Sequence, residues 1–507
     1  MFESKKMGIV LSYINTILSM IFGIILSSYL IKTLGDTEYG LYQTVTAFAN
    51  YLLILEIGTG TITQRNVVIC YQKGDTEGID KTISTMWIIT IILSLGILIV
   101  SICLYLGLGI LYQNTMTCYQ IRYAKKIFSF FIGNMLLTFL TQTLNGYAFG
   151  VEKVSFAQIA RLVKAVLRTI TIIVITLFYK YSIVIAAVDF VISLLIFIVT
   201  FRFCKRKCAM RIRLALFDKS IIVEAFPLCV ALLFQSLIQQ ANSSVDKVII
   251  GSRLSIEDVA IYSVAQSIYY IFMSILIAPI SMYLPQISRD MNSGVNRRKF
   301  TDTLIQPTRL IAIISGIFLF GFIAVGKQFV VLFYGSEKSQ AWIYALIIIV
   351  PLFLSMTNGV ILNVLDITKK RLARSIVLLG ATLANVILTW FFTKSMGVVG
   401  AVTATAITMV AGEVVVLNIY YAVALKIDIH RLYWEAYRKT LPILIIAAWI
   451  AYIIGGIFSN SIHGLFVGGI AYLLCAGVFL YRFALLDNEK QELHRWIRIL
   501  KNRLKKT

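Results

Sequence analysis

The sequence predicts an all-α polytopic membrane protein with about fourteen transmembrane helices, and three observations lead to that class. Hydrophobic residues make up 59% of the 507 residues and charged residues only 14%, and the mean hydropathy is +0.85. Apolar stretches of spanning length recur along the whole chain. Basic residues gather in every second loop between those stretches. A soluble protein of this length needs far more charge to cover its surface, so soluble classes are excluded.

Each apolar stretch is expected to form one membrane-spanning helix, because about 20 apolar residues cross the hydrocarbon layer. The stretches lie at 9–31, 41–63, 83–107, 127–149, 161–180, 182–203, 221–250, 259–284, 304–325, 342–366, 375–393, 398–424, 442–458 and 464–481.

The loop charges orient these spans. Basic residues are dense in the even-numbered loops and sparse in the odd-numbered ones, as the positive-inside rule requires if the N-terminus is cytoplasmic. The basic loops include Lys205–Lys207, Arg297–Lys299 and Lys369–Arg371. An even number of spans then places both termini in the cytoplasm. The net charge of +23 is distributed over these loops, so it indicates topology and anionic lipid headgroups rather than nucleic acid.

The sequence offers no basis for enzymatic chemistry. It contains no phosphate-binding glycine loop of the P-loop type, and its three histidines form no cluster with carboxylates. The seven cysteines show no CxxC pair, so no metal site or cofactor is expected. The loops are too short to hold a folded domain. We therefore expect the chain to be no enzyme.

Internal similarity indicates two related halves. Leu34–Tyr42 aligns with Leu254–Tyr262 at an offset of 220, and Leu144-Asn145 aligns with Leu362-Asn363 at 218. Six spans per unit give both copies the same orientation, a parallel repeat about an axis along the membrane normal. The predicted division is a six-helix bundle at 1–215, a second at 216–440, two further spans at 441–482, and a basic amphipathic tail at 483–507.

The seventh span carries a polar face. Gln235, Gln239, Asn242 and Asp246 fall on one line of a helix, and Lys247 lies on a second line about 100° away. Lipid cannot solvate these groups, so the face is expected to line a water-filled lumen; a polar seam between packed helices is the alternative. At the 220 offset, Asn15 of the first span matches Gln235, which favours a cavity between the repeats.

Ionisable residues inside spans are the remaining candidates, because each is expensive in the membrane and therefore suggests function. We expect Arg168, Lys247 and Arg309, with the amides above, to bind an anionic, hydroxyl-rich solute. The carboxylates Glu56, Asp246 and Glu413 are candidates for ion coupling by a proton or Na⁺. Two structural alternatives remain: Arg309 can snorkel from a helix end, and Asp246 with Lys247 can form a neutral packed pair.

With these residues in view, the chain resembles the polysaccharide flippase (Wzx-type) family of the multidrug/oligosaccharidyl-lipid/polysaccharide exporter superfamily. The likeness covers the first twelve spans, with Ala260 standing where the family usually has glycine. The residues that carry it are Leu34-Gly35, Glu38–Tyr42, Glu56-x-Gly58-x-Gly60, Asp246-Lys247, Gly251, Tyr262-x-x-Ala265, Pro279, Pro285, Leu362-Asn363 and Gly397-x-x-Gly400-Ala401-x-x-Ala404-Thr405.

The resemblance implies a flippase of the bacterial cytoplasmic (inner) membrane. Its substrate would be an undecaprenyl-diphosphate-linked oligosaccharide, moved from the cytoplasmic to the outer leaflet by alternating access through a cationic lumen. Its partners would be this glycan, the bilayer and polysaccharide assembly proteins. An ion-coupled multidrug or metabolite exporter of the same fold is the alternative, and it would favour acidic over basic lumen residues. A membrane-embedded glycan polymerase would need a large outer loop, which this sequence lacks.

Overall fold

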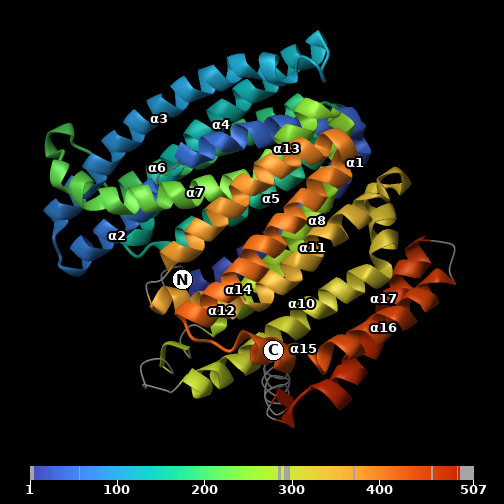
Figure 1. Ribbon diagram of the computed structural model, residues 1–507. Helices are drawn as coiled ribbons and strands as arrows, with labels where there is room; N and C mark the ends of the chain where they lie inside the picture. The colour runs from blue at the N-terminus through green and yellow to red at the C-terminus, as the bar shows by residue number, and fades with distance from the viewer. Residues whose placement is uncertain are drawn as a thin grey trace, which may run out of the picture. The chain divides into compact units, whose positions relative to one another are not determined.

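The computed structural model describes residues 5–55, 58–283, 287–289, 297–368, 371–457, 461–487 and 489–490, and these residues form helices and connecting turns without a β-strand (Figure 1). The all-α class expected from the sequence is confirmed. Residues 491–507, most of the predicted amphipathic tail, lie outside the described residues.

Contacts divide the chain into two compact units. Unit 1 comprises Met1–Val264 with Val386–Ala401, and unit 2 comprises Ala265–Asn385 with Val402–Thr507. The seventh span belongs to unit 1, where it packs against the first and third helices. The two units group residues that lie close in space and do not test whether the two halves are repeats. The predicted bundle boundary at 215/216 therefore stays a prediction.

The helices that begin in unit 1 follow the order of the predicted spans. They are α1 Lys5–Ala49, η1 Asn50–Leu55, α2 Thr59–Gln72, α3 Thr76–Tyr112, α4 Cys118–Gly150, α5 Val154–Phe178, α6 Ser182–Lys207, η2 Leu214–Leu216, α7 Lys219–Arg253 and α8 Ile256–Met282, which continues into unit 2.

The helices of unit 2 continue that order, with α13 also contributing to unit 1. They are α10 Arg297–Tyr334, η3 Ser336–Lys338, α11 Ala341–Thr357, α12 Gly359–Ile367, α13 Arg371–Met409, η4 Val410–Val416, α14 Leu417–Ala424, α15 Ile429–Tyr437, α16 Thr440–Gly456, α17 Ser461–Phe479 and η5 Leu480–Ala484.

Two expected loops are sharp kinks, each at a single non-helical glycine between two helical segments that share one label. At Gly35 the backbone of α1 has φ 77° and ψ 176°, and at Gly397 the backbone of α13 has φ 60° and ψ −141°. Both conformations are strained for residues with a side chain, so glycine is required where the chain turns without a loop. Conversely, the second predicted span is broken, because a 3₁₀ segment and Gly58 (φ 60°) interrupt it.

Within the described residues, nine stretches are long and apolar enough to cross a membrane. One of them, Leu372–Ala424, has 53 residues, which is about 80 Å of helix and far more than one crossing needs. It contains the bend at Gly397, so it accounts for two predicted spans. The polar α7 is not among the nine. The total of fourteen stays a prediction.

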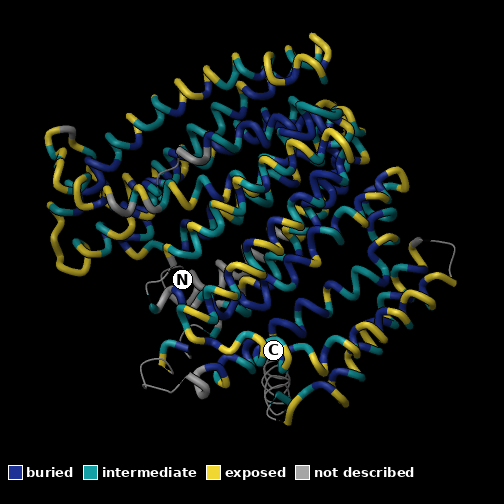
Figure 2. The backbone as a smooth tube through the Cα atoms, viewed as in Figure 1, coloured by how far each residue is buried: buried dark blue, intermediate teal, exposed yellow. Residues whose placement is uncertain are grey.

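Each unit has its own apolar core. In unit 1, Val67, Ile83, Leu144 and Cys204 bring α2, α3, α4 and α6 together. In unit 2, one cluster joins α10, α12, α14 and α15, and another joins α10, α16 and α17. Exposed residues run along α3, α16 and α17 (Figure 2), and most of these exposed side chains are large and apolar. Apolar surface of this extent suits lipid rather than water.

Candidate functional site

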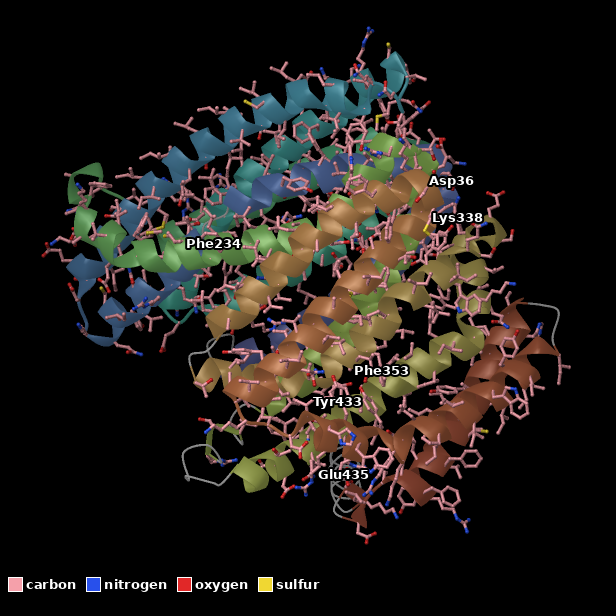
Figure 3. The ribbon with its side chains drawn as sticks, viewed as in Figure 1. Asp36, Phe234, Lys338, Phe353, Tyr433 and Glu435 are labelled. Atoms are coloured by element: carbon pink, nitrogen blue, oxygen red, sulfur yellow. The ribbon has the colours of Figure 1, made fainter. Side chains whose placement is uncertain are left out.

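The polar face of α7 is divided between exposed amides and a buried carboxylate. Gln235, Gln239 and Asn242 are exposed, and their neighbour Phe234, marked in Figure 3, is 52% exposed. One turn further along the same line, Asp246 is only 2% exposed. Exposed amides on a span-length helix cannot face hydrocarbon without loss of their hydrogen bonds. Their assignment to a lumen stays a prediction.

The start of α7 is fixed by Asp218, whose carboxylate accepts hydrogen bonds from the Ser220 hydroxyl at 2.6 Å and from the Ser220 backbone N–H at 2.8 Å. These two bonds stabilise the charged form and lower the pKa of the Asp218 carboxyl. The residue therefore acts as an N-cap at the end of α7 remote from Asp246.

Lys247 contacts α1. Its ammonium donates to Gln43 Oε1 at 3.1 Å, and the Gln43 amide donates in turn to the Tyr39 hydroxyl at 2.9 Å. Among the described residues no carboxylate lies within 4.0 Å of the ammonium, and Asp246 does not pair with it. The neutral Asp246–Lys247 pair considered from the sequence is therefore absent. The Lys247 ammonium is therefore held by an amide rather than by a carboxylate.

Arg168 on α5 contacts Tyr42, the residue of α1 that precedes Gln43. Its Nη2 donates to the Tyr42 hydroxyl at 3.3 Å. Its guanidinium also donates two hydrogen bonds, of 2.6 and 3.0 Å, to the Asp189 carboxylate on α6. This fork-to-fork geometry is the strong form of the arginine–carboxylate pair. The pair neutralises Arg168 in part and leaves Lys247 as the less compensated cation near this turn of α1.

Asp246 is held by neutral hydroxyl groups. Its carboxylate accepts from the Tyr262 hydroxyl at 2.6 Å and from the Thr389 hydroxyl at 3.3 Å. These partners come from α8 and α13, and all three residues belong to unit 1. A buried carboxylate held by hydroxyl groups can take up a proton or a monovalent cation at low structural cost. Its role in coupling stays a prediction.

The Leu34–Tyr42 motif of α1 has a structural role close to Arg168 and Lys247. Glu38 accepts from the Ser182 backbone N–H at 2.9 Å and so caps the first turn of α6. A Cβ atom on Gly40 would lie 2.1 Å from the carbonyl oxygen of Ile256, so only glycine allows α1 and α8 this approach. The motif therefore fixes the helix that carries Tyr42 and Gln43.

Two predicted residues lie in unit 2. Arg309 is 2% exposed, and its donors reach the Glu489 carboxylate at 3.0 Å and the carbonyl oxygens of Glu435 and Ala484 at 2.7 and 2.9 Å. Arg309 thus connects α10 to the segment after α17. These contacts explain why Arg309 is buried without any need for a substrate. Glu413 accepts a hydrogen bond from the Ser355 hydroxyl. The predicted roles of both residues are untested by these contacts.

Two predicted residues cannot be placed. Glu56 and the side chain of Asn15 lie outside the described residues. Conversely, no site role was predicted for Tyr39 or Gln43, and Asp189 was not identified as a partner of Arg168. The signal for Asp189 was present, because a second ionisable residue in an adjacent span is the expected partner of the first.

Comparisons with known proteins show the family and the fold of the chain. A family profile described as "Polysaccharide biosynthesis protein" matches residues 6–291, more than half of the chain. Among curated proteins, none matches with significant similarity.

Solved transporters share the fold. A lipid II flippase MurJ in an inward closed conformation superposes with a TM-score of 0.70 at 18% identity, over 93% of this chain and 99% of that one. An inward-facing multidrug resistance MATE family transporter of the MOP superfamily gives 0.60 at 17% identity, over 81% and 95%. Its outward-facing counterpart gives 0.53 at 16% identity, over 83% and 96%. The chain therefore shares its fold with these transporters and belongs to the polysaccharide biosynthesis protein family, as its motifs predicted.

Proposed function

We propose that this protein is a flippase that carries an undecaprenyl-diphosphate-linked oligosaccharide from the cytoplasmic to the outer leaflet by alternating access. One observation supports an anionic lipid-linked substrate above others: Arg168 and Lys247 contact consecutive residues of α1, Tyr42 and Gln43. Lys247 has no carboxylate partner among the described residues. A diphosphate is the group that such a cation recognises, and the exposed amides of α7 suit sugar hydroxyls.

The proposal includes a topology. Both termini lie in the cytoplasm of a bacterium, and the chain resides in its inner membrane, where lipid-linked glycans are assembled. Asp246 and Glu413 supply coupling through a proton or Na⁺. The polysaccharide assembly machinery on the outer face receives the product.

The alternative is a multidrug or metabolite exporter, which the resemblance of the fold to MATE transporters leaves open. An exporter of cationic drugs needs uncompensated acidic groups where this chain has Lys247. The basic residue therefore favours the anionic substrate.

A leaflet assay in proteoliposomes tests the proposal. The full-length protein is reconstituted with a fluorescent undecaprenyl-diphosphate oligosaccharide, and the fraction exposed to an external glycan-modifying enzyme is followed. We expect exposure to increase over time with wild-type protein and to remain at the level of protein-free vesicles with Lys247→Gln. Wild-type protein that moves a cationic dye but no lipid-linked glycan would favour the exporter.

A further inference from the structure

Unit 2 contains a polar cluster that the predicted substrate site does not include. It joins α11 to the helix formed by η4 and α14 through two neighbouring contacts. Ser355 donates to the Glu413 carboxylate, and Asn358 Nδ2 donates to Asn418 Oδ1 at 2.8 Å. Phe353 and Tyr433 mark this part of unit 2 in Figure 3. We call Ser355, Asn358, Glu413, Asn418 and Tyr433 the unit 2 cluster.

A π-helical turn brings Glu413 and Asn418 to the same side. The two residues are five positions apart, and on a regular α-helix they would point about 140° away from each other. The segment Val410–Val416 is instead a π-helix, in which the i→i+5 hydrogen bond closes each turn. The turn therefore aims both side chains at α11. Such turns are rare and recur at functional sites.

Glu413 has no basic counterpart. Among the described residues, no lysine or arginine lies within 4.0 Å of its carboxylate. Arg374 on α13 lies near Tyr421, and its Nε is buried without a hydrogen-bond partner. The other titratable groups that interact with the carboxylate are Tyr269 on α8 and Tyr421 on α14. An uncompensated carboxylate on a membrane-spanning helix needs a bound positive charge.

Asn358 offers a spare oxygen in the same cluster. The residue stands at the break between α11 and α12 and is 4% exposed. Its Nδ2 donates to Asn418 and, at 2.7 Å, to the Tyr433 hydroxyl, while its Oδ1 is buried without a partner. The Tyr433 hydroxyl is directed at the carbonyl of Leu354 at 3.3 Å, so it can accept from Asn358. These bonds fix the amide, and buried acceptors are rarely left unpaired.

We propose that Glu413, Ser355 and Asn358 bind a monovalent cation, a proton or Na⁺, inside unit 2, at a second ion site distinct from Asp246. Carboxylate, hydroxyl and amide oxygens are the ligands that hard cations prefer, and a proton would reside on the Glu413 carboxyl. The break at Asn358 and the π-helical turn are the backbone features that such a site can move when the ion leaves. The inference rests on the proposed transport function only for the ion's purpose, because ion binding needs no substrate.

Thermal unfolding of the purified full-length protein tests the site. A ligand that binds only the folded state raises Tm with the logarithm of its concentration. The Tm is measured against NaCl, with choline chloride keeping ionic strength constant, and separately against pH without Na⁺. We expect wild-type protein to respond to one of these and Glu413→Gln to lose that response. Glu435→Gln is the matched control, because its half-buried carboxylate already pairs with Arg438.

The two arms identify the ion. Loss of a Na⁺ response in Glu413→Gln assigns Na⁺, and loss of a pH response in the absence of any Na⁺ response assigns a proton. A folded Glu413→Gln protein whose Tm follows both NaCl and pH as wild type does overturns the site. If that variant does not fold, Ser355→Ala removes only a hydroxyl, and a tenfold or greater rise in the Na⁺ concentration at half-response, or a displaced pH midpoint, is expected.

Asp246→Asn separates the two ion sites. We expect it to retain the component of the response that Glu413→Gln removes, and loss of all response in Asp246→Asn alone would assign the ion to Asp246 instead. Failure of the leaflet assay with wild-type protein would contradict the proposed flippase activity but would leave these ion responses unchanged. The two failures are therefore distinguishable.

Discussion

Thr37 and Glu257 hydrogen-bond to each other across 220 residues of chain, with the Thr37 hydroxyl donating to the Glu257 carboxylate at 2.8 Å. The same interval relates Leu34–Tyr42 to Leu254–Tyr262. A residue contacts its own counterpart only near the axis that relates two copies. This contact is what the predicted parallel repeat would produce close to its axis, and the repeat itself stays a prediction.

A cross-link at this contact is expected to stop transport. In a cysteine-free background, Thr37→Cys with Glu257→Cys is treated with a short bifunctional thiol reagent. The proposed alternating access would separate the two motifs during each cycle, so linked protein should show no glycan movement in the leaflet assay. Each single-cysteine variant, treated in the same way, should transport normally. Full activity of the linked protein would show that this contact persists throughout transport.

Lys247→Gln is expected to reduce glycan transport about tenfold or more, because a charge-assisted contact to phosphate contributes roughly 1.5–3 kcal/mol. Protein level and Tm should remain normal, since Lys247 makes one hydrogen bond, to Gln43. Lys180→Gln, at an exposed position between α5 and α6, is the matched control. Equal transport by the two variants would remove Lys247 from the substrate site.

Arg168→Gln is expected to reduce stability as well as transport. It leaves the Asp189 carboxylate, whose side chain is 9% exposed, without its partner. We expect a loss of about 2 kcal/mol, below the full value for a buried pair because the Arg168 side chain is 33% exposed. Combining it with Asp189→Asn should recover most of the lost Tm without recovering transport. A double variant less stable than the single one would contradict this account.

Glu489→Ala is expected to destabilise unit 2 by about 3–5 kcal/mol, because it leaves the buried Arg309 guanidinium without its carboxylate. Thermal unfolding of the purified protein measures the effect. Asp487→Asn, two residues away and 95% exposed, should leave Tm unchanged. If transport per folded molecule is retained in Glu489→Ala, Arg309 serves structure rather than substrate binding.

Gly35→Ala is expected to destabilise the protein by about 1–3 kcal/mol, because φ 77° with ψ 176° is a region that essentially only glycine occupies. Gly96→Ala in α3 is the control, since a Cβ atom there meets no atom within 4 Å. We expect it to be neutral or stabilising, as alanine favours the helix. Similar Tm values for the two variants would mean that α1 can turn in another way.

The sequence predicts best what depends on local pattern. Apolar length identified the membrane-spanning class, and the 3.6-residue period identified the polar face of α7, whose amides are exposed in the structure. It predicts least where two helices must be placed against each other. Asp189 is 21 residues from Arg168, and only the packing of α5 on α6 brings the two together.

Backbone irregularities were also invisible in the sequence. The contact of Glu413 with Ser355 depends on a π-helical turn, which has no composition of its own. The burial of Arg309 depends on a segment 180 residues later that folds back onto α10. In both cases the side chain was recognised as unusual, but its partner is set by tertiary structure.

The Arg168–Asp189 pair also bears on how the chain is made. Each of these residues alone in mid-bilayer disfavours insertion by about 2.5–3.5 kcal/mol. Only residues 179–181 separate α5 from α6, so the two helices can leave the translocon together as a hairpin with their charges already matched. The two helices would then insert as a pair rather than one after the other. In ribosome-stalled chains that end within α6, α5 would therefore insert poorly into the lipid.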